Sequence, residues 1–458
     1  MSVQQPQRQT TWLRFGAVAL GLFCIQLDFF ALGLALPTIA AELGTTTTDL
    51  QWVVSGYMLA LGALMIPATR LADLVGRKRV LLVGIGIFGL ASLLCGLAPT
   101  SSLLIAARVV QGIGGAMVLP VAYVVVTNAT TDEERPRIMG VISGMANIGT
   151  ALGPIVGGLL ASTVGWRWVF WVNVPFAVAG VVLGRRTLQE SRDRTGHTVR
   201  DLDWLGIVLV AVGVAALSLG LDSVSNPSVS TALTLGALVI GVGMLVAFVR
   251  QERHHRWPLI SGELVRRRSF VELLSAGTLA NVGYCVMMIV VTIQLQQVRG
   301  FPAAVAGVVF LAPAVMTALC GPIAGRLAGR VPGGRVMAVC LVLGSAGLVV
   351  QAVSTSLIVD VLGLMISGLC FGMGYTFTTI ATQSVLPTSL SSEASGLVIT
   401  TIVTLGAFGV ITGAVGIEVF GPDLASATAS TLLWTGVVLF AVGLVFGWMQ
   451  RKTPTVAE

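Results

Sequence analysis

The sequence predicts an all-helical integral membrane protein with fourteen transmembrane helices. Hydrophobic residues make up 55% of the 458 residues, charged residues make up only 10%, and the mean hydropathy is +0.92. Soluble domains carry about 25% charged residues. The chain also contains fourteen apolar runs of roughly the twenty residues that cross a bilayer core of about 30 Å. Together these two observations exclude a soluble globular protein.

The predicted spans follow one another with short connections, and the two longest interruptions hold about twenty residues each. In order, they cover residues 14–38, 51–72, 80–98, 102–127, 138–162, 167–185, 204–222, 231–250, 271–295, 304–325, 335–353, 356–381, 395–418 and 430–449.

The distribution of basic residues orients these spans. With the N-terminus inside, the inner segments hold 24 of the 27 Lys and Arg residues, and the outer loops hold only Arg167 and Arg299. Loops rich in Lys and Arg stay on the cytoplasmic side, so we expect both termini in the cytoplasm and the protein in the cell (inner) membrane. The net charge of +7 is assigned to orientation and lipid contact, and no nucleic-acid partner is expected.

The residues that carry enzymatic or metal chemistry form no pattern here. All six cysteines lie within predicted spans, without paired spacing, which disfavours disulfides and metal sites. The sequence contains no metal-ligand, Ser/His/Asp or phosphate-loop motif. We therefore expect a protein that is not an enzyme, uses no nucleotide and binds no cofactor or metal.

Two inner loops reveal an internal repeat. "RLADLVGRKRV" (residues 70–80) and "RLAGRVPGGRV" (residues 326–336) match at six of eleven positions with a constant offset of 256. Both loops join the second and third helices of a six-helix unit, and parallel repeats of this kind are a transporter architecture. The predicted organisation is an N-terminal bundle (1–190), an insert of two helices with linkers (191–255) and a C-terminal bundle (256–458).

The fifth span contains an unusual run of helix breakers, "GVISGMANIGTALGPIVGG" (residues 140–158). Gly149, Gly153 and Gly157 recur every four residues, so they form one bare helix face that lets another helix approach closely. Pro154 removes a backbone hydrogen bond and bends the helix. We expect this smooth, bent helix to lie at the seam between the two halves, where it suits a rocking motion.

Two charges lie well inside the predicted membrane core, Asp28 and Arg108. Each costs about 2.5–3.5 kcal/mol on insertion scales. Asp28 lies roughly 21 Å from the inner face and Arg108 roughly 9 Å from the outer face, at about 1.5 Å per residue, so both fall at a similar height. We expect them to face each other across the cavity of the N-terminal half.

This placement predicts proton coupling. Desolvation raises the pKa of a carboxyl group and a nearby cation lowers it, so a carboxyl group placed like Asp28 can bind and release a proton as water reaches it from one side. A cationic substrate would compete with the proton for the carboxylate. A static structural ion pair with Arg108 is the alternative.

The other acidic candidates are weaker. Asp360 and Glu418 lie near the outer ends of the twelfth and thirteenth spans, and Asp360 is four residues from the repeat equivalent of Arg108. The tenth span contains no acidic residue. A divalent organic cation would need a second buried negative charge, so we expect monovalent cations or neutral lipophilic compounds.

The substrate cavity is expected to be apolar with a few polar groups and adaptable methionine and aromatic side chains. About a third of the candidates are expected to line it. The candidates are Gln26, Trp52, Tyr57, Gln111, Met117, Met145, Asn147, Asn281, Tyr284, Met288, Phe371 and Tyr375.

Several stretches resemble the major facilitator superfamily, and within it the 14-helix drug/proton antiporters. "RLADLVGRKR" is similar to the family's loop 2–3 motif, with Thr69 in place of the opening glycine, and "RVVQGIGGA" (residues 108–116) resembles the helix 4 motif. "LDFFALGLALPTIAAEL", "WRWVFWVNVPF" and "DLDWLG" are typical of the 14-helix branch. The resemblance covers nearly the whole chain and implies the major facilitator fold.

The resemblance also implies roles for individual residues. In this family the loop 2–3 motif, here with Asp73, Gly76 and Arg77, latches the two halves on the cytoplasmic side. The motif G-x8-G-x3-G-P-x2-G-G marks exporters that exchange substrate for protons. It is matched here by Gly140, Gly149, Gly153, Pro154, Gly157 and Gly158.

The predicted function is therefore proton-coupled efflux of lipophilic, cationic or neutral organic compounds by alternating access, as in a multidrug antiporter energised by the proton gradient. One alternative is a narrow exporter of a single metabolite or self-made antibiotic. A second is a proton-coupled uptake symporter, against which the helix 5 motif argues. A third is a sensor that binds its ligand without transporting it.

Overall fold

The computed structural model describes residues 10–45, 50–131, 133–192, 202–224, 229–255, 258–260, 262–327, 330–386 and 390–452. All regular elements among them are helical. Thirteen helices are long and apolar enough to cross a membrane, and α8 adds a shorter apolar stretch, Trp204–Gly220. These observations agree with the predicted fourteen-helix membrane fold. The elements are α1 (Thr10–Leu43), α2 (Gln51–Val75), α3 (Arg77–Leu97), α4 (Ser101–Ala129), α5 (Arg135–Thr163), α6 (Arg167–Trp171), α7 (Asn173–Thr187), α8 (Trp204–Val224), α9 (Thr231–His254), α10 (Gly262–Arg266), α11 (Arg268–Ile293), the π-helical turn η2 (Gln294–Val298), α12 (Ala303–Leu327), α13 (Gly333–Val353), α14 (Leu357–Ser384), α15 (Ser391–Val419) and α16 (Leu424–Lys452).

The sixth predicted span differs most from the prediction, because the helix is interrupted at Val172 between α6 and α7. Pro175 explains the break, since a proline lacks an amide hydrogen and its ring clashes with the carbonyl four residues earlier, here that of Trp171. The sequence also did not predict the short helix α10 or the π-helical turn that extends α11.

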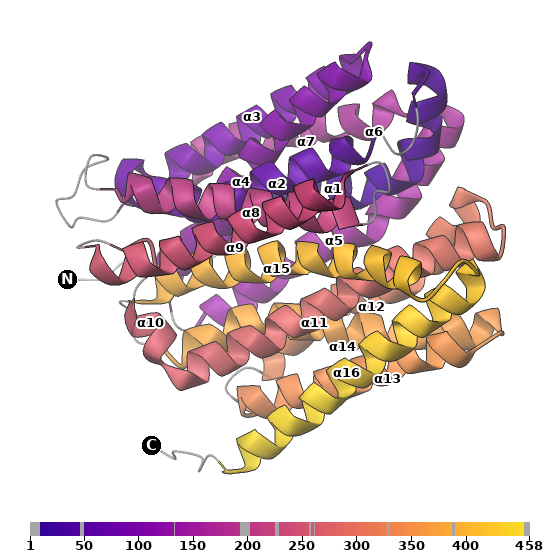
Figure 1. Ribbon diagram of the computed structural model, residues 1–458. Coiled ribbons are helices and arrows are strands. Elements are labelled where there is room, and N and C mark those ends of the chain that lie inside the picture. The colour runs from indigo at the N-terminus through magenta and orange to yellow at the C-terminus, as the bar shows by residue number, and fades with distance from the viewer. Residues whose placement is uncertain are drawn as a thin grey trace, which may run out of the picture.

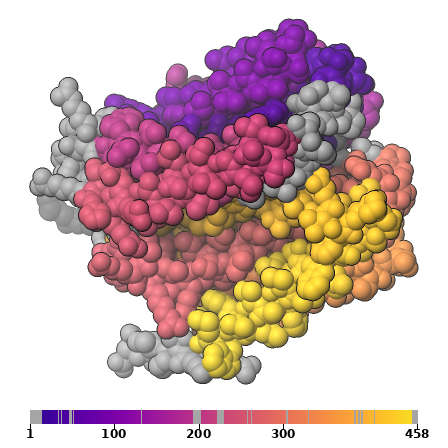
Figure 2. All heavy atoms as spheres, in the orientation of Figure 1, coloured from indigo at the N-terminus to yellow at the C-terminus, as the bar shows by residue number. Residues whose placement is uncertain are grey.

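The helices form two bundles with a helical hairpin at their side. Helices α1 to α7, indigo to magenta in Figure 1, form one bundle, and α11 to α16, pink to yellow, form the other. The α8–α9 hairpin lies over the junction of the two bundles (Figure 2). We call the end of the molecule at which α2 ends and α15 begins the basic face, because α3 begins there with the Arg77-Lys78-Arg79 run.

A close helix contact recurs at the repeat offset of 256. Gly112 of α4 lies so close to the backbone of Tyr57 in α2 that a Cβ atom would collide with it. The equivalent residues of the second bundle are Gly368 of α14 and Pro313 of α12, and they also lie against each other. The same close approach of the second and fourth helices in both bundles supports the predicted pseudo-repeat.

Helices α8 and α9 pack tightly on each other. Gly213 of α8 meets Leu245 of α9, and Gly241 of α9 meets Leu217 of α8. The division at 190/191 and 255/256 stays a prediction, and residues 193–201 and 256–257 beside these boundaries lie outside the described residues.

Candidate functional site

Asp28 and Arg108 form a buried ion pair inside the N-terminal bundle. Asp28 Oδ2 lies 2.5 Å from Arg108 Nη1, and neither side chain is exposed. The sequence predicted that these residues lie at a similar depth, and the structure brings them into direct contact between α1 and α4.

Hydrogen bonds from neighbouring helices complete this charge cluster. Asp28 Oδ1 accepts hydrogen bonds from Gln111 Nε2 at 3.0 Å and from Asn173 Nδ2 at 2.9 Å. Arg108 Nε donates to the carbonyl of Val53 at 2.9 Å. A buried ion pair needs hydrogen-bond partners for its remaining polar atoms. Residues of α2, α4 and α7 supply most of them, whereas Arg108 Nη2 is buried without a partner among the described residues.

Sequence reasoning missed two members of the cluster. Asn173 opens α7 directly after the break at Val172, and Ser92 of α3 accepts a hydrogen bond from Gln111 Nε2 at 2.8 Å. Both side chains are fully buried. A polar side chain within an otherwise apolar span was the available signal, but only the fold shows that Asn173 reaches Asp28 directly and that Ser92 is linked to it through Gln111.

A central cavity lies between the two bundles, with about 740 Å³ of empty volume. Seven of the twelve candidates line it, more than the expected third. They are Gln26, Tyr57, Asn147, Asn281, Tyr284, Phe371 and Tyr375.

The other five candidates do not line this cavity, and the expectation of about a third had left room for that. Gln111 belongs to the charge cluster. Met288 is buried and Met117 and Met145 are partly buried, all outside the cavity wall, and Trp52 is 43% exposed at the start of α2.

The cavity wall is neutral, because none of the nineteen described lining residues is charged, and six of them are aromatic. Its amides are anchored by hydrogen bonds. Gln26 Nε2 donates to Thr150 Oγ1 at 3.0 Å, and Asn147 Nδ2 reaches across the seam to the carbonyl of Thr317 at 3.0 Å. Such a wall suits an apolar ligand that is oriented by a few polar contacts.

Aromatic rings separate the charge cluster from the cavity. Tyr57 and Phe29 line the cavity, whereas Asp28 and Arg108 do not. The guanidinium carbon of Arg108 lies 4.2 Å from the centroid of the Tyr57 ring, and the Phe29 ring stacks beside Tyr57 with centroids 6.4 Å apart. The two charges therefore face each other, as expected, but in direct contact behind these rings and not across a cavity.

The glycine run of α5 meets two different helices. Cβ atoms at Gly149, Gly153 and Gly157 would collide with α1 of the same bundle. Gly140 instead lies against the backbone of Gly321 in α12. The bare face therefore lets another helix approach, as predicted. The stripe of Gly149, Gly153 and Gly157 faces α1, whereas Gly140 lies at the seam between the bundles.

The remaining motif residues of α5 are also buried. Gly158 and Pro154 lie in the interior. The carbonyl of Pro154 is within 3.4 Å of the position that a Cβ atom of Gly307 in α12 would take, so the proline faces the other bundle.

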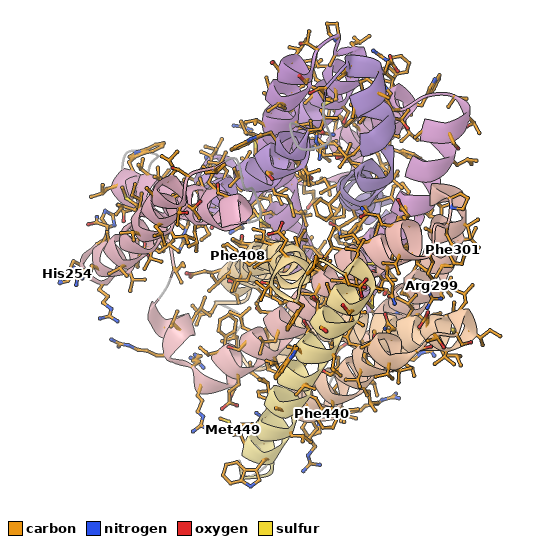
Figure 3. All side chains as sticks on the ribbon, turned by 45° about the vertical axis from the view of Figure 1, so that its right-hand side comes forward. His254, Arg299, Phe301, Phe408, Phe440 and Met449 are labelled. Carbon is orange, nitrogen blue, oxygen red and sulfur yellow. The ribbon has the colours of Figure 1, made fainter. Side chains whose placement is uncertain are left out.

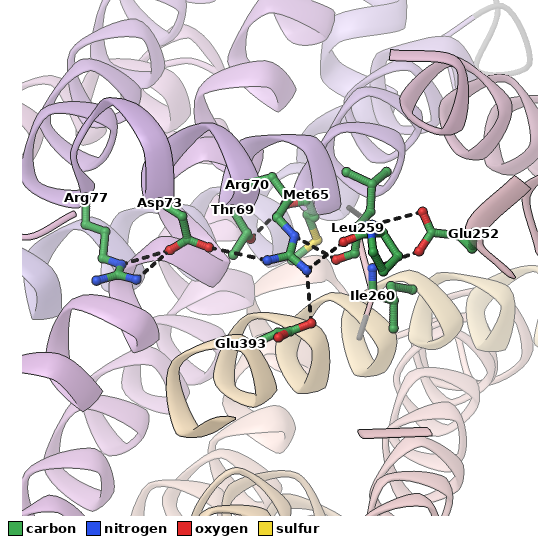
Figure 4. Close-up of polar contacts among 10 residues, drawn as sticks. Met65, Thr69, Arg70, Asp73, Arg77, Glu252, Leu259, Ile260 and Glu393 are labelled. Carbon is green, nitrogen blue, oxygen red and sulfur yellow. Dashed lines mark hydrogen bonds and ion pairs between the residues drawn. The ribbon is translucent and has the colours of Figure 1, made fainter. Parts of the chain in front are cut away.

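The loop 2–3 motif forms a compact ion pair at the basic face (Figure 4). Arg77 Nη2 lies 2.7 Å from Asp73 Oδ1. Gly76 between α2 and α3 has φ = 127°, a backbone conformation that residues other than glycine rarely adopt. A Cβ atom at position 76 would also collide with the carboxylate of Glu190.

Arg70, which was not among the predicted site residues, connects three segments. Its Nη2 atom lies 2.9 Å from Glu393 Oε1 of α15, and its Nε and Nη2 atoms donate to the carbonyls of Leu259 and Pro258 (Figure 4). Nearby, Thr127 Oγ1 and Ser395 Oγ are 2.8 Å apart. The two bundles are thus joined at the basic face. The available signal for Arg70 was its place at the head of the repeated loop.

The two weaker acidic candidates lie apart from the cavity. Asp360 is buried and pairs with Arg299, which follows η2. Figure 3 places Arg299 beside Phe301, on the opposite side of the molecule from His254 at the end of α9. Glu418 is exposed near the end of α15.

Comparisons with known proteins agree with this architecture. The family model described as Major Facilitator Superfamily matches residues 18–414. The multidrug resistance protein Stp of Mycobacterium tuberculosis is 33% identical over 93% of this chain and 78% of its own length. The puromycin resistance protein pur8 of Streptomyces alboniger is 35% identical over 66% of this chain and 59% of its own length.

A solved structure shares the fold. The crystal structure of the human organic anion transporter MFSD10 (TETRAN) aligns with a TM-score of 0.63 at 17% sequence identity. The alignment covers 96% of this chain and all of the other. At this identity the match shows the fold alone.

Proposed function

The chain belongs to the major facilitator superfamily, a family of membrane transporters, and we propose that it is a proton-coupled exporter of lipophilic, neutral or monovalent cationic organic compounds. The observation that carries the proposal is the pairing of a neutral, aromatic cavity between the bundles with a buried Asp28–Arg108 ion pair directly behind its wall.

The chemistry of the cavity supports the substrate class. Aromatic faces attract monovalent cations without a carboxylate, and apolar walls favour lipophilic bodies. Relatives named for multidrug and puromycin resistance support the same class. They are bacterial, which supports a location in the cell membrane, and the basic face is then the cytoplasmic one by the positive-inside rule.

Coupling between substrate and proton is indirect in this proposal. Tyr57 lies between the cavity and Arg108. A cation bound in the cavity therefore interacts with the same aromatic ring that stabilises the guanidinium group. A shift of Tyr57 weakens the hold of Arg108 on Asp28 and opens a path by which the carboxylate takes up a proton. A proton at Asp28 would in turn release Arg108 toward Tyr57.

The contacts at the basic face fit one state of an alternating-access cycle. The Arg70–Glu393 and Thr127–Ser395 contacts hold the two bundles together at the basic face, as a state closed toward the cytoplasm requires. The reverse state requires these contacts to break, which makes the basic face a gate in the cycle.

Energised efflux of ethidium from loaded cells tests the proposal. Wild-type protein is expected to export ethidium, and both a protonophore and Asp28→Asn are expected to stop it at normal expression. Efflux that continues undiminished with the protonophore would contradict proton coupling.

Tyr57→Phe and Tyr57→Leu test the indirect route. The phenylalanine keeps the aromatic face over Arg108 and is expected to retain most of the efflux. The leucine removes that face and should lower efflux at least about fivefold, the equivalent of roughly 1 kcal/mol of cation–π energy. Equal activity of the two variants would contradict a coupling role for the ring.

A narrow exporter of one compound is the second candidate, and the relative named for puromycin resistance favours it. Ethidium efflux by wild-type protein excludes the narrow exporter. If a well-expressed wild type exports puromycin but not ethidium, the narrow exporter becomes the better reading.

A further inference from the structure

A second cavity lies beside the central one, in the half of the molecule away from the basic face. It has about 1200 Å³ of empty volume, and α1, α2, α8, α11 and α15 all contribute to its walls. Phe29, Met58, Leu61 and Val403 line both cavities. The two spaces are therefore neighbours that share a partition of four side chains.

The second cavity differs from the central one in chemistry. Its seventeen described lining residues include no charged side chain, and their only polar side chains are the hydroxyls of Ser55, Ser218 and Thr404. Thr404 Oγ1 is buried and has no hydrogen-bond partner among the described residues. Such walls accept a hydrocarbon body and offer a cation less than the central cavity does, because Phe29 in the shared partition is the only aromatic side chain among the described lining residues.

The inserted helix α8 forms the membrane-side wall of this cavity. Val214, Ser218 and Leu219 line it, whereas Val208 and Val212 of the same helix are 54% and 40% exposed. At the level of the cavity α8 is itself backed by α9, because Leu217 meets Gly241 and Gly220 meets Leu238. The α8–α9 hairpin therefore stands between the cavity and the surrounding lipid.

The α8 wall is packed firmly on the side of the basic face. There, Val210 and Val214 pack in a buried cluster with Phe248 of α9 and Leu259. A Cβ atom at Gly62 of α2 would touch the side chains of both Val214 and Thr404, so α2, α8 and α15 come together at this point of the cavity wall.

We propose that the second cavity binds the hydrocarbon chain of a substrate whose compact cationic head occupies the central cavity. The chain passes between Phe29 and Met58, and α8 shields it from the membrane. The identity of the ligand as a lipophilic cation rests on the proposed function, whereas the position of the chain rests on the cavity. This gives the two inserted helices a role in selecting substrates by the length of their apolar part.

Binding of two cations with the same head tests this inference. Methyltriphenylphosphonium carries no chain and dodecyltriphenylphosphonium carries one of twelve carbons. Radiolabelled methyltriphenylphosphonium is bound to the purified full-length protein in lipid nanodiscs, and each cation is used as the competitor. Partitioning of the dodecyl compound into disc lipid is the same for every variant, so the ratio between variants isolates the contribution of the protein.

Ser218→Trp fills the cavity from α8, and Ala414→Phe fills it from α15. Each is expected to weaken dodecyl binding at least about tenfold, the effect of roughly two methylene groups returned to water. Methyl binding should change less than about twofold by the same reasoning, since the head lies elsewhere. Val212→Trp, on the exposed side of α8, is the matched control and should change neither value.

Several results would overturn the inference. They are unchanged dodecyl binding in both filled variants, equal loss of both cations in both variants, or wild-type protein that binds the dodecyl cation no more tightly than the methyl one. Loss of a co-purifying phospholipid from Ser218→Trp, with dodecyl binding intact, would assign the cavity to bilayer lipid instead.

The outcomes for the two proposals are separable. Selective loss of dodecyl binding in a protein that exports neither cation would retain the chain site and reject the exporter. Normal proton-driven efflux without any chain-length effect would do the reverse.

Discussion

The two bundles follow one plan but differ in where they place charge. At the offset of 256, Asp28 and Arg108 correspond to Tyr284 and Leu364. The first two form a buried ion pair, whereas Tyr284 lines the central cavity and Leu364 is buried in the interior. The N-terminal bundle thus holds a charge cluster behind its cavity wall, and the C-terminal bundle offers an aromatic surface at the matching place.

A polar contact next to these charges, by contrast, occurs in both bundles. Cys95 of α3 and Gln111 of α4 are 3.8 Å apart, and their equivalents, Gln351 of α13 and Ser367 of α14, are hydrogen-bonded at 3.3 Å. Equivalent positions therefore keep their helix-to-helix contacts while their chemistry diverges. The comparison indicates that the fold is symmetric and that proton coupling, as proposed, belongs to one bundle.

Replacing Arg108 by leucine, the residue at the equivalent position 364, should have the largest effect on stability and efflux. Arg108→Leu leaves Asp28 buried without its partner, which typically costs 3–5 kcal/mol of stability, and efflux should be abolished. Thermal unfolding of the purified protein and ethidium efflux measure both effects. Leu364→Met is the control in the other bundle and should cost less than about 1.5 kcal/mol. A stable, active Arg108→Leu protein would remove the asymmetry on which the coupling proposal depends.

The next largest effect is expected where α5 meets α1 within the N-terminal bundle. In Gly157→Ala the new methyl group collides with the backbone of Ala31, and backbone cannot yield as a side chain can. We expect a loss of about 1–3 kcal/mol or more, seen as a lower midpoint of thermal unfolding. Gly33→Ala is the matched control on α1, because nothing lies within 4 Å of its Cβ position. Equal midpoints for the two variants would contradict the close approach.

A smaller effect is expected at the repeated loops. Arg70 ties α2 to Glu393 of α15, whereas its equivalent, Arg326, is exposed. Arg70→Ala should weaken the contact between the bundles at the basic face. The rate at which a water-soluble maleimide labels Ser395→Cys should then rise several-fold, since an ion pair of this kind contributes roughly 1 kcal/mol. Arg326→Ala should leave the rate unchanged. Identical rates in the two variants would show that Arg70 is not part of the gate.

The smallest effect is expected at an exposed ion pair. Arg167 donates a hydrogen bond to the carboxylate of Glu42, and this interaction lowers the pKa of Glu42 from its ordinary value of 4.5. Because the folded-state pKa is lowered, the stabilisation is present above that value and is lost as the pH falls through the lowered one.

Exposed pairs contribute little, so Glu42→Gln should lower the unfolding midpoint at pH 7 by less than about 2 °C. The difference from wild type should disappear in acid well below pH 4.5. A large difference that persists in acid would mean that Glu42 acts through packing and not through charge.

The sequence by itself determined the helical membrane fold, the internal repeat and the two charges in the membrane core. Each of these is fixed by the bilayer, which acts on every helix separately. A run of about twenty residues must be apolar to cross it, basic loops remain on one side, and a charge inside it is costly wherever it lies. Asp28 and Arg108 were therefore visible without any knowledge of their surroundings.

Only the tertiary structure decided what these residues touch. That Asn173 and Ser92 join the charge cluster, that Tyr57 separates it from the cavity, and that the α5 glycines face α1 depends on the rotation and register of each helix. Lipid tails are as apolar as the side chains that face them, so hydrophobicity does not mark which face of a helix turns inward. Close packing and hydrogen bonds between helices distant in sequence choose that face, and those choices placed the ion pair behind the cavity wall.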